Sequence, residues 1–133
     1  MQWLLHGNLP SELAADLVQR GHKTHALADL SLAPEATLPD ILNAAAVAQW
    51  DILTADPALV AVLFGPAEDL PRMFGRSVVL IQPQPGELAH AILDRLFDRY
   101  PRLTTFRLYT VTPSRVKVRQ LPRRRPMRAA NGD

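Results

Sequence analysis

The stretch Ser77-Val78-Val79-Leu80-Ile81 contains four consecutive apolar residues after a serine, and three of them are β-branched. A short, continuous apolar run of this kind predicts a strand buried on both faces, as in a parallel sheet covered by helices. Two further runs favour strands, residues 2–5 and Asp51–Thr54. The centre of the protein is therefore expected to be a sheet of short parallel strands.

Helical patterns separate these runs. After Ser11, which suits an N-cap, apolar residues recur at helical spacing until Gly21, which suits the residue just past a helix. A weaker pattern predicts a second strand over residues 22–28, and residues 31–37 and 65–75 are expected to be loops. The remaining helices are predicted over residues 39–49, 57–63 and 85–100.

The hydrophobic period changes from 3.6 to 2 near the end of the chain. Phe106, Leu108 and Thr110 alternate with Arg107 and Tyr109, and residues 116–119 alternate in the same way. This pattern predicts a hairpin with one apolar and one basic face. With the strand–helix repeat before it, the sequence predicts an α/β fold of three layers, α/β/α. Its sheet is mostly parallel and ends in a C-terminal antiparallel hairpin.

Composition sets the broad class. The chain has 133 residues, of which 47% are apolar and 21% charged, and it contains no cysteine. This predicts one domain over residues 1–120 followed by a basic tail over residues 121–133. No apolar run approaches the ~20 residues of a membrane span, and the first residues lack the pattern of a secretory signal. A cytoplasmic protein without a membrane segment is the expectation.

The charge of the chain is uneven. Residues 1–115 carry 9 Lys and Arg against 12 Asp and Glu, whereas residues 116–133 carry 6 against 1. A cationic end of this kind indicates either a polyanionic partner such as RNA or a solvated tail. If RNA binds, the contacts are expected at Arg119, Arg123, Arg124 and Arg125, with Phe106 and Tyr109 as the aromatic residues of the hairpin that could stack on bases.

In an open α/β sheet, ligands bind outside the carboxyl ends of the strands, where the strand order reverses. The segments expected there are His6-Gly7-Asn8, Thr54-Ala55-Asp56 and Asp40 at the start of a helix. The sequence lacks the glycine-rich nucleotide motifs, the nucleophile elbow and the H-E-x-x-H zinc motif. Dehydrogenases, kinases, serine hydrolases and zincins are therefore disfavoured.

Several motifs together resemble the bacterial PIN-like proteins related to toxin-type nucleases, over about residues 1–120. Each motif is short, and their shared order and spacing carry the resemblance. The matching segments are Trp3-Leu4-Leu5-His6-Gly7-Asn8-Leu9-Pro10 (family F-L-L-D-E-N-L-P), Leu13…Leu17…Gly21-His22 (L…L…G-H), His25…Asp29-Leu30 (H-x-x-D-L, with one residue more), Pro39-Asp40-Ile41-Leu42 and Ile52-Leu53-Thr54-Ala55-Asp56 (I-L-T-x-D).

The resemblance implies cleavage of a phosphodiester, usually in RNA, with Mg²⁺ or Mn²⁺ held by carboxylates. It implies Asp56 and Asp40 as catalytic metal ligands, His6 as an auxiliary ligand, and Asn8 and Thr54 as orienting residues. It also implies an antitoxin-like protein partner, and the hairpin could pair with a second copy of the chain.

The sequence departs from the family at three positions. His6 and Gly7 replace two acidic residues, and Ala58 replaces an aspartate. Each remaining candidate also has a structural interpretation: His6 as a hydrogen-bonded histidine at a strand end, Asp56 as a helix N-cap and Asp40 as a first-turn acid. Two hypotheses follow: a ribonuclease relative with an eroded site, or a non-catalytic module that binds nucleic acid or protein.

Overall fold

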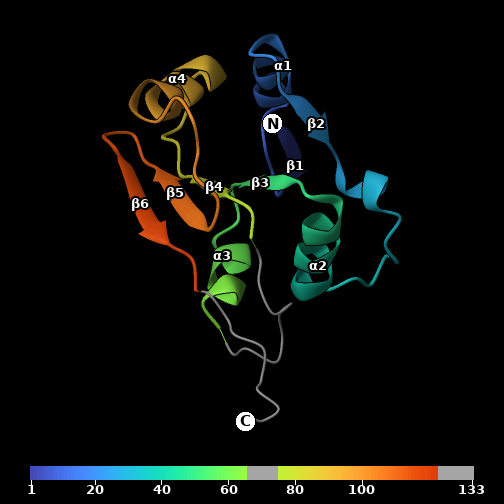
Figure 1. Cartoon of the computed structure of the whole chain (residues 1–133). Helices are drawn as coiled ribbons and strands as arrows, with labels where there is room; N and C mark the ends of the chain where they lie inside the picture. Colours follow the sequence, from blue (N-terminus) through green and yellow to red (C-terminus); the bar gives the residue numbers. More distant parts are fainter. Residues whose placement is uncertain (66–74, 123–133) are drawn as a thin grey trace.

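A computed structural model describes residues 1–65 and 75–122 (Figure 1). The six strands of its sheet lie in the order β2-β1-β3-β4-β5-β6, and every neighbouring pair is parallel except the antiparallel pair β5–β6. The expected mostly parallel sheet with a C-terminal antiparallel hairpin is confirmed. The strands are β1 (Gln2–His6), β2 (Lys23–His25), β3 (Asp51–Thr54), β4 (Val78–Ile81), β5 (Arg107–Val111) and β6 (Val116–Gln120).

Helices cover both faces of this sheet (Figure 1). One apolar cluster joins α1 and α4 to Trp3, Leu53 and Val79, and the other joins α2 and α3 to Leu4 and Ile52. Successive strand residues thus enter opposite cores, as the period of a strand requires. The helices are α1 (Ser11–Gln19), the short 3-10 helix η1 (Leu27–Leu30), α2 (Leu38–Ala48), α3 (Pro57–Leu63) and α4 (Ala89–Arg99).

The predicted second strand is wrong in its extent. β2 ends at His25, and residues 27–30 form η1 instead. Asp29 explains the change, because its carboxylate accepts a hydrogen bond from the backbone N–H of Ala26 at 2.8 Å and so closes the turn. Side chains that bond to the local backbone compete with the strand ladder, and no strong strand former stands here to resist them.

Two helix starts also differ from the prediction. In α1 the N-cap is Pro10, with Ser11 as the first helical residue. The last helix starts at Ala89 rather than at residue 85, because residues 85–86 form a turn in which Gly86 has φ +79°. That left-handed conformation suits glycine and cannot continue a right-handed helix.

The predicted faces of the hairpin are correct for β6 and wrong for β5. Phe106 has φ +62°, so the strand starts one residue later. Tyr109 and Val111 then pack toward α4, while Leu108 enters the opposite core. β5 is therefore buried on both faces, because it is an inner strand whose two faces pack into the two apolar clusters.

The boundary of the predicted tail needs a small correction. Leu121 is predicted from the sequence to be part of the tail. In the structure it is 2% exposed and belongs to the core cluster of α2 and α3. The expected loop at residues 66–74 and the basic residues 123–133 lie outside the described residues. Within the described ranges, no helix combines the length and apolar character needed to cross a bilayer.

Candidate functional site

The strand order reverses between β1 and β3. From β1 the chain goes to β2 on one side, and all later strands lie on the other side. His6 and Thr54, the last residues of β1 and β3, are paired in the sheet. The structure thus brings His6-Gly7-Asn8 beside Thr54-Ala55-Asp56 at the edge formed by the carboxyl ends of the strands, hereafter the carboxyl edge, where open α/β sheets bind ligands.

Gly7 has a left-handed backbone conformation beside the second loop. Its φ is +84°, and a Cβ built on it would be in ordinary van der Waals contact, 3.5 Å from the Cβ of Asp56. The left-handed conformation favours glycine, so the position that is acidic in the resembling family has a backbone requirement of its own here. Beyond it, the N–H of Leu9 donates to the carbonyl of Gly7 at 3.0 Å, which places exposed Asn8 in the middle of a tight turn.

A chain of hydrogen bonds joins the site residues. Nδ1 of His6 lies 2.9 Å from Oγ1 of Thr54, and the backbone N–H of Asp56 donates to the same hydroxyl oxygen at 2.9 Å. Oδ1 of Asp56 in turn accepts from the N–H of Ala58 at 2.9 Å, as an N-cap of α3. The hydroxyl of Thr54 is therefore the centre of the site, since it holds both the imidazole and the loop that carries the carboxylate.

The electrostatics favour a neutral imidazole. Burial lowers the pKa of His6 below its ordinary value of 6.5, and the negative charge of Asp56 opposes this effect. His6 is only 7% exposed, so the cost of removing its cation from water is the larger influence. A neutral imidazole is the form that accepts a proton or ligates a metal ion.

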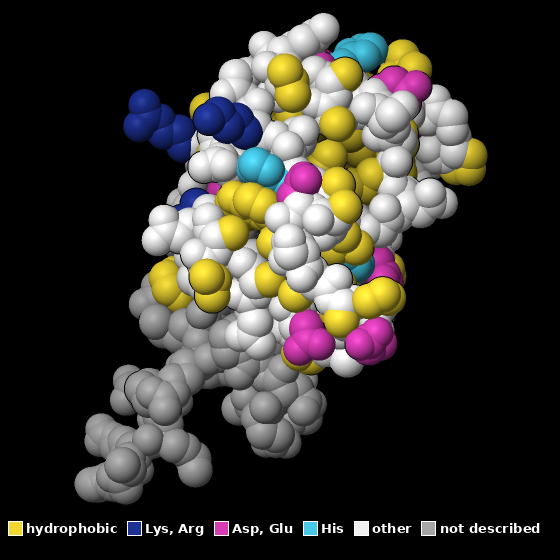
Figure 2. Space-filling model, turned by 90° about the vertical axis from the view of Figure 1, so that its right-hand side faces the viewer, with side chains coloured by type: hydrophobic (Ala, Val, Ile, Leu, Met, Phe, Trp, Pro, Cys, Tyr) yellow, Lys and Arg dark blue, Asp and Glu magenta, His cyan; other side chains and the backbone are white. Residues whose placement is uncertain are grey.

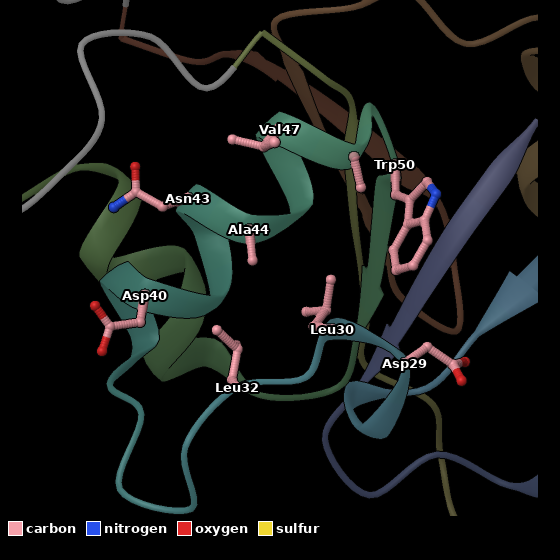
Figure 3. Close-up of a pocket in the computed structure, with 9 residues that line it drawn as sticks. Asp29, Leu30, Leu32, Asp40, Asn43, Ala44, Val47 and Trp50 are labelled. Carbon is pink, nitrogen blue, oxygen red and sulfur yellow. The ribbon is translucent and has the colours of Figure 1, made fainter.

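In the structure Asp40 caps the start of α2. It forms a capping box with Thr37: Oδ2 of Asp40 accepts from the N–H of Thr37 at 3.0 Å, and Oγ1 of Thr37 accepts from the N–H of Asp40 at 3.4 Å. Its exposed side chain borders a hollow beside α2 (Figure 3). Among residues 1–65 and 75–122, no three side chains of the metal-ligating types are gathered to hold an ion.

The donor set does not suit Mg²⁺. That ion needs a near-octahedral shell of oxygens. His6 and Asp56 together offer an imidazole Nε2 and one carboxylate oxygen, since Nδ1 and Oδ1 already have partners. An imidazole–carboxylate pair suits a softer ion such as Mn²⁺ better, and then with solvent as most of its shell.

The basic candidates are only partly described. The guanidinium of Arg119 lies over the ring of Phe64, the C-cap of α3, at 3.9 Å from its centre. Arg123, Arg124 and Arg125 lie outside the described residues. The expectation that Tyr109 could stack on bases is wrong, because Tyr109 is buried and its hydroxyl accepts from the N–H of Thr104 at 2.8 Å.

Sequence reasoning missed a second polar cluster, at the amino end of β3. Asp51 is 1% exposed; its Oδ1 accepts from the N–H and the hydroxyl of Ser77 at 3.0 and 2.8 Å, and Oδ2 pairs with Arg76 at 3.3 Å. The sequence signal for this cluster is a charged residue at the first position of an otherwise apolar strand. A charged residue in a buried strand needs hydrogen-bond or ion-pair partners, so its presence there indicates such a cluster.

Comparisons of the chain with protein-family models, with curated proteins and with solved structures found no match.

Proposed function

We propose that the protein is a PIN-like domain, related to metal-dependent ribonucleases, whose catalytic edge is eroded and which binds RNA without metal-dependent cleavage. The observation that carries the proposal is the hydrogen-bonded series His6–Thr54–Asp56. It occupies the strand ends where the resemblance implies a group of carboxylates. The side chains found there are instead the imidazole of His6 and the carboxylate of Asp56, which caps α3.

Cleavage of a phosphodiester by metal ions needs carboxylates that are free to bind them, so that the ions can activate water and neutralise the phosphate. Here one atom of each candidate ligand already has a hydrogen-bond partner within the fold. These pairs are Nδ1 of His6 with Thr54, Oδ1 of Asp56 with Ala58, and Oδ2 of Asp40 with Thr37. The edge also carries less negative charge to attract divalent ions, because His6 and Gly7 stand where the resembling family has acidic residues. This favours loss of cleavage.

RNA contact is proposed at the basic outer strand. β6 is the last strand of the sheet and exposes Lys117 and Arg119, with Arg115 in the turn before it. Contacts of Lys and Arg with phosphates are independent of sequence and weaken with salt. Because Tyr109 is buried, stacking on bases contributes little, and weak binding is expected.

We also propose a cellular location and two partners for the protein. The absence of cysteine suits a reducing compartment, so we place the protein in the cytoplasm. An antitoxin-like protein is a proposed partner by the same resemblance. The outer edge of β6, which pairs with no further strand among the described residues, could also pair with a second copy of the chain, which light scattering of the purified protein would test.

A cleavage assay tests the erosion of the site. Labelled RNA is incubated with Mn²⁺ or Mg²⁺ and either the intact chain or the Asp56→Ala variant. We expect no cleavage that depends on Asp56. Cleavage by the intact chain that disappears in the variant would refute the proposal and support an active enzyme.

A binding assay tests the RNA surface. Lys117→Gln is compared with Lys23→Gln, which removes the same charge from β2 at the opposite end of the sheet. We expect Lys117→Gln to weaken binding and to reduce its salt dependence, while Lys23→Gln changes neither. Equal effects of the two variants would contradict contact through β6.

An active enzyme is the second candidate, and one observation favours it. The negative charge of Asp56 raises the pKa of His6 against the effect of burial, so the two side chains interact electrostatically at the carboxyl edge. Calorimetry with Mn²⁺ distinguishes the candidates: heat of binding that is lost in Asp56→Ala supports the enzyme, and equal heats in both proteins count against it.

A further inference from the structure

An apolar hollow of about 570 Å³ lies on the side of the molecule that carries η1 and α2 (Figure 3). It is separate from the carboxyl-edge residues His6, Thr54 and Asp56, none of which lines it. Its apolar surface comes mainly from η1, the segment after it, the outer face of α2 and the residue before β3. The residues used below are Asp29, Leu30, Leu32, Asp40, Val47 and Trp50.

The surface of the hollow is exposed and held in place. Val47 is 86% exposed on α2, although nothing in helix formation calls for a valine on a solvated face. Leu30, Leu32 and Trp50 are partly buried and packed against the core below. One face of the Trp50 ring stacks on His25 with the ring centres 3.8 Å apart, which fixes its orientation. Together these side chains offer an exposed apolar surface on which another apolar segment can pack.

The charge around the hollow has one sign. Figure 3 shows Asp29 and Asp40 on opposite sides of it, with Leu30 between them. Oδ2 of Asp29 accepts a hydrogen bond from the N–H of Ala26, and Oδ2 of Asp40 accepts one from the N–H of Thr37. Among the described residues no Lys or Arg lines the hollow, and in Figure 2 their visible Lys and Arg side chains lie at one edge of this face. A segment with apolar residues flanked by cationic residues would therefore complement the hollow in both polarity and charge.

The chain itself contains such a segment. Pro126 and Met127 stand between Arg125 and Arg128 in the basic stretch 123–133, which lies outside the described residues. The last part of the described chain points to the same side of the sheet, because Leu121 is buried in the core cluster of α2 and α3. The five residues from the end of the described chain at residue 122 to Met127 span up to about 17 Å when extended. The three strand spacings from β6 to β3, which Trp50 directly precedes, amount to about 14 Å.

We propose that the basic segment of residues 123–133 docks into this hollow in the same molecule, with Pro126 and Met127 on its apolar surface and the arginines toward Asp29 and Asp40. The charges and the apolar surface are complementary, and the chain is long enough. Arg123, Arg124 and Arg125 are also the tail residues that the sequence predicts to contact RNA, so docking and RNA binding would compete for them. This competition rests on the proposed RNA binding, whereas the docking itself does not.

A spin label on the intact chain tests this directly. Because the protein has no cysteine, Ala130→Cys gives a single attachment site for a nitroxide. We expect the nitroxide to broaden the amide NMR signals of η1 and of the second half of α2, and an increase in salt to reduce that broadening. Val47→Glu, which places a carboxylate on the hollow at a position that is 86% exposed, is expected to abolish it.

The matched control is Val18→Glu. Val18 is 56% exposed on α1, which covers the opposite face of the sheet, so this variant introduces the same charge away from the hollow and should leave the broadening unchanged. Equal loss in both variants, or broadening spread over both faces, would overturn the proposal. Broadening that appears only when labelled and unlabelled chains are mixed would also overturn it, in favour of a second copy. The amide spectra of both variants show whether they remain folded.

Discussion

The two ends of β3 each carry an aspartate, and the two carboxylates have different environments. Asp51, at the amino end, is 1% exposed, and both of its oxygens are bound by Ser77 and Arg76. Asp56, just beyond the carboxyl end, is partly exposed and has one oxygen bound by Ala58. The aspartate at the amino end thus uses both carboxylate oxygens to stabilise the fold, whereas Oδ2 of Asp56 at the carboxyl end remains available to a ligand. Only the first is fully enclosed by partners, so its loss should destabilise the fold more than the loss of Asp56.

The largest effect is expected from Asp51→Ala. The variant removes the acceptor of two buried Ser77 donors and unpairs Arg76, so the free energy of unfolding should fall by about 3 kcal/mol. Urea denaturation measures it. Asp51→Asn keeps an acceptor for Ser77 and should cost less, and Asp98→Ala, at an exposed position on α4, should cost little. Equal stability of all three variants would show that the enclosed aspartate is not structural.

Thr54→Val is next in size. It keeps the shape of the side chain but removes the hydroxyl that contacts both His6 and the N–H of Asp56, so a loss of about 2 kcal/mol in unfolding free energy is expected. Thr54→Ser retains the hydroxyl and is the control. If the valine variant were as stable as the serine variant in urea, the hydrogen-bond series at the carboxyl edge would carry no stabilisation.

Asp56→Ala should cost about 1 kcal/mol, the usual value for loss of an N-cap. Asp56→Asn keeps the cap but removes the charge that acts on His6. Both variants should therefore lower the pKa of His6 further, while only the alanine variant loses stability. NMR titration of the imidazole and urea denaturation measure the two effects separately. An unchanged His6 pKa in Asp56→Asn would break the proposed coupling.

The smallest effect concerns pH. Because burial lowers the pKa of His6 below 6.5 in the folded state, the unfolded chain binds more protons between the lowered value and 6.5. Stability should be complete above pH 6.5 and should decrease as pH falls through that window. His22, whose pKa burial also lowers, acts in the same direction. Unfolding free energies across this range should depend less on pH in His6→Gln, and an unaltered slope would contradict the assignment.

Local patterns predicted much of the architecture. The apolar run before residue 82 indicated a strand buried on both faces, and Pro57 after Asp56 indicated a helix with an aspartate cap; both are present. Such features depend on residues a few positions apart. The errors arose where a local side chain or backbone conformation intervened: Asp29 closing η1, Gly86 delaying α4, and Phe106 shifting the faces of β5.

The site was predictable in position but not in its bonding. The rule for open sheets placed His6 and Asp56 at one edge, and the strand pairing brings those segments together. The shared hydroxyl of Thr54 and the closure of Asp40 onto Thr37 depend on side-chain directions that sequence spacing does not specify.

By itself, the sequence determined which segments form strands and helices at the centre of the chain, and which ends of them carry polar residues. Those properties follow from periodicity and from capping, which act over a few residues. Only the tertiary structure decided the partners that lie far apart in the chain: Ser77 for Asp51, Thr54 for His6 and Phe64 for Arg119. The physical reason is that burial and hydrogen-bond geometry are set when layers pack, so they decide whether a given carboxylate is enclosed by the fold or remains available to a ligand.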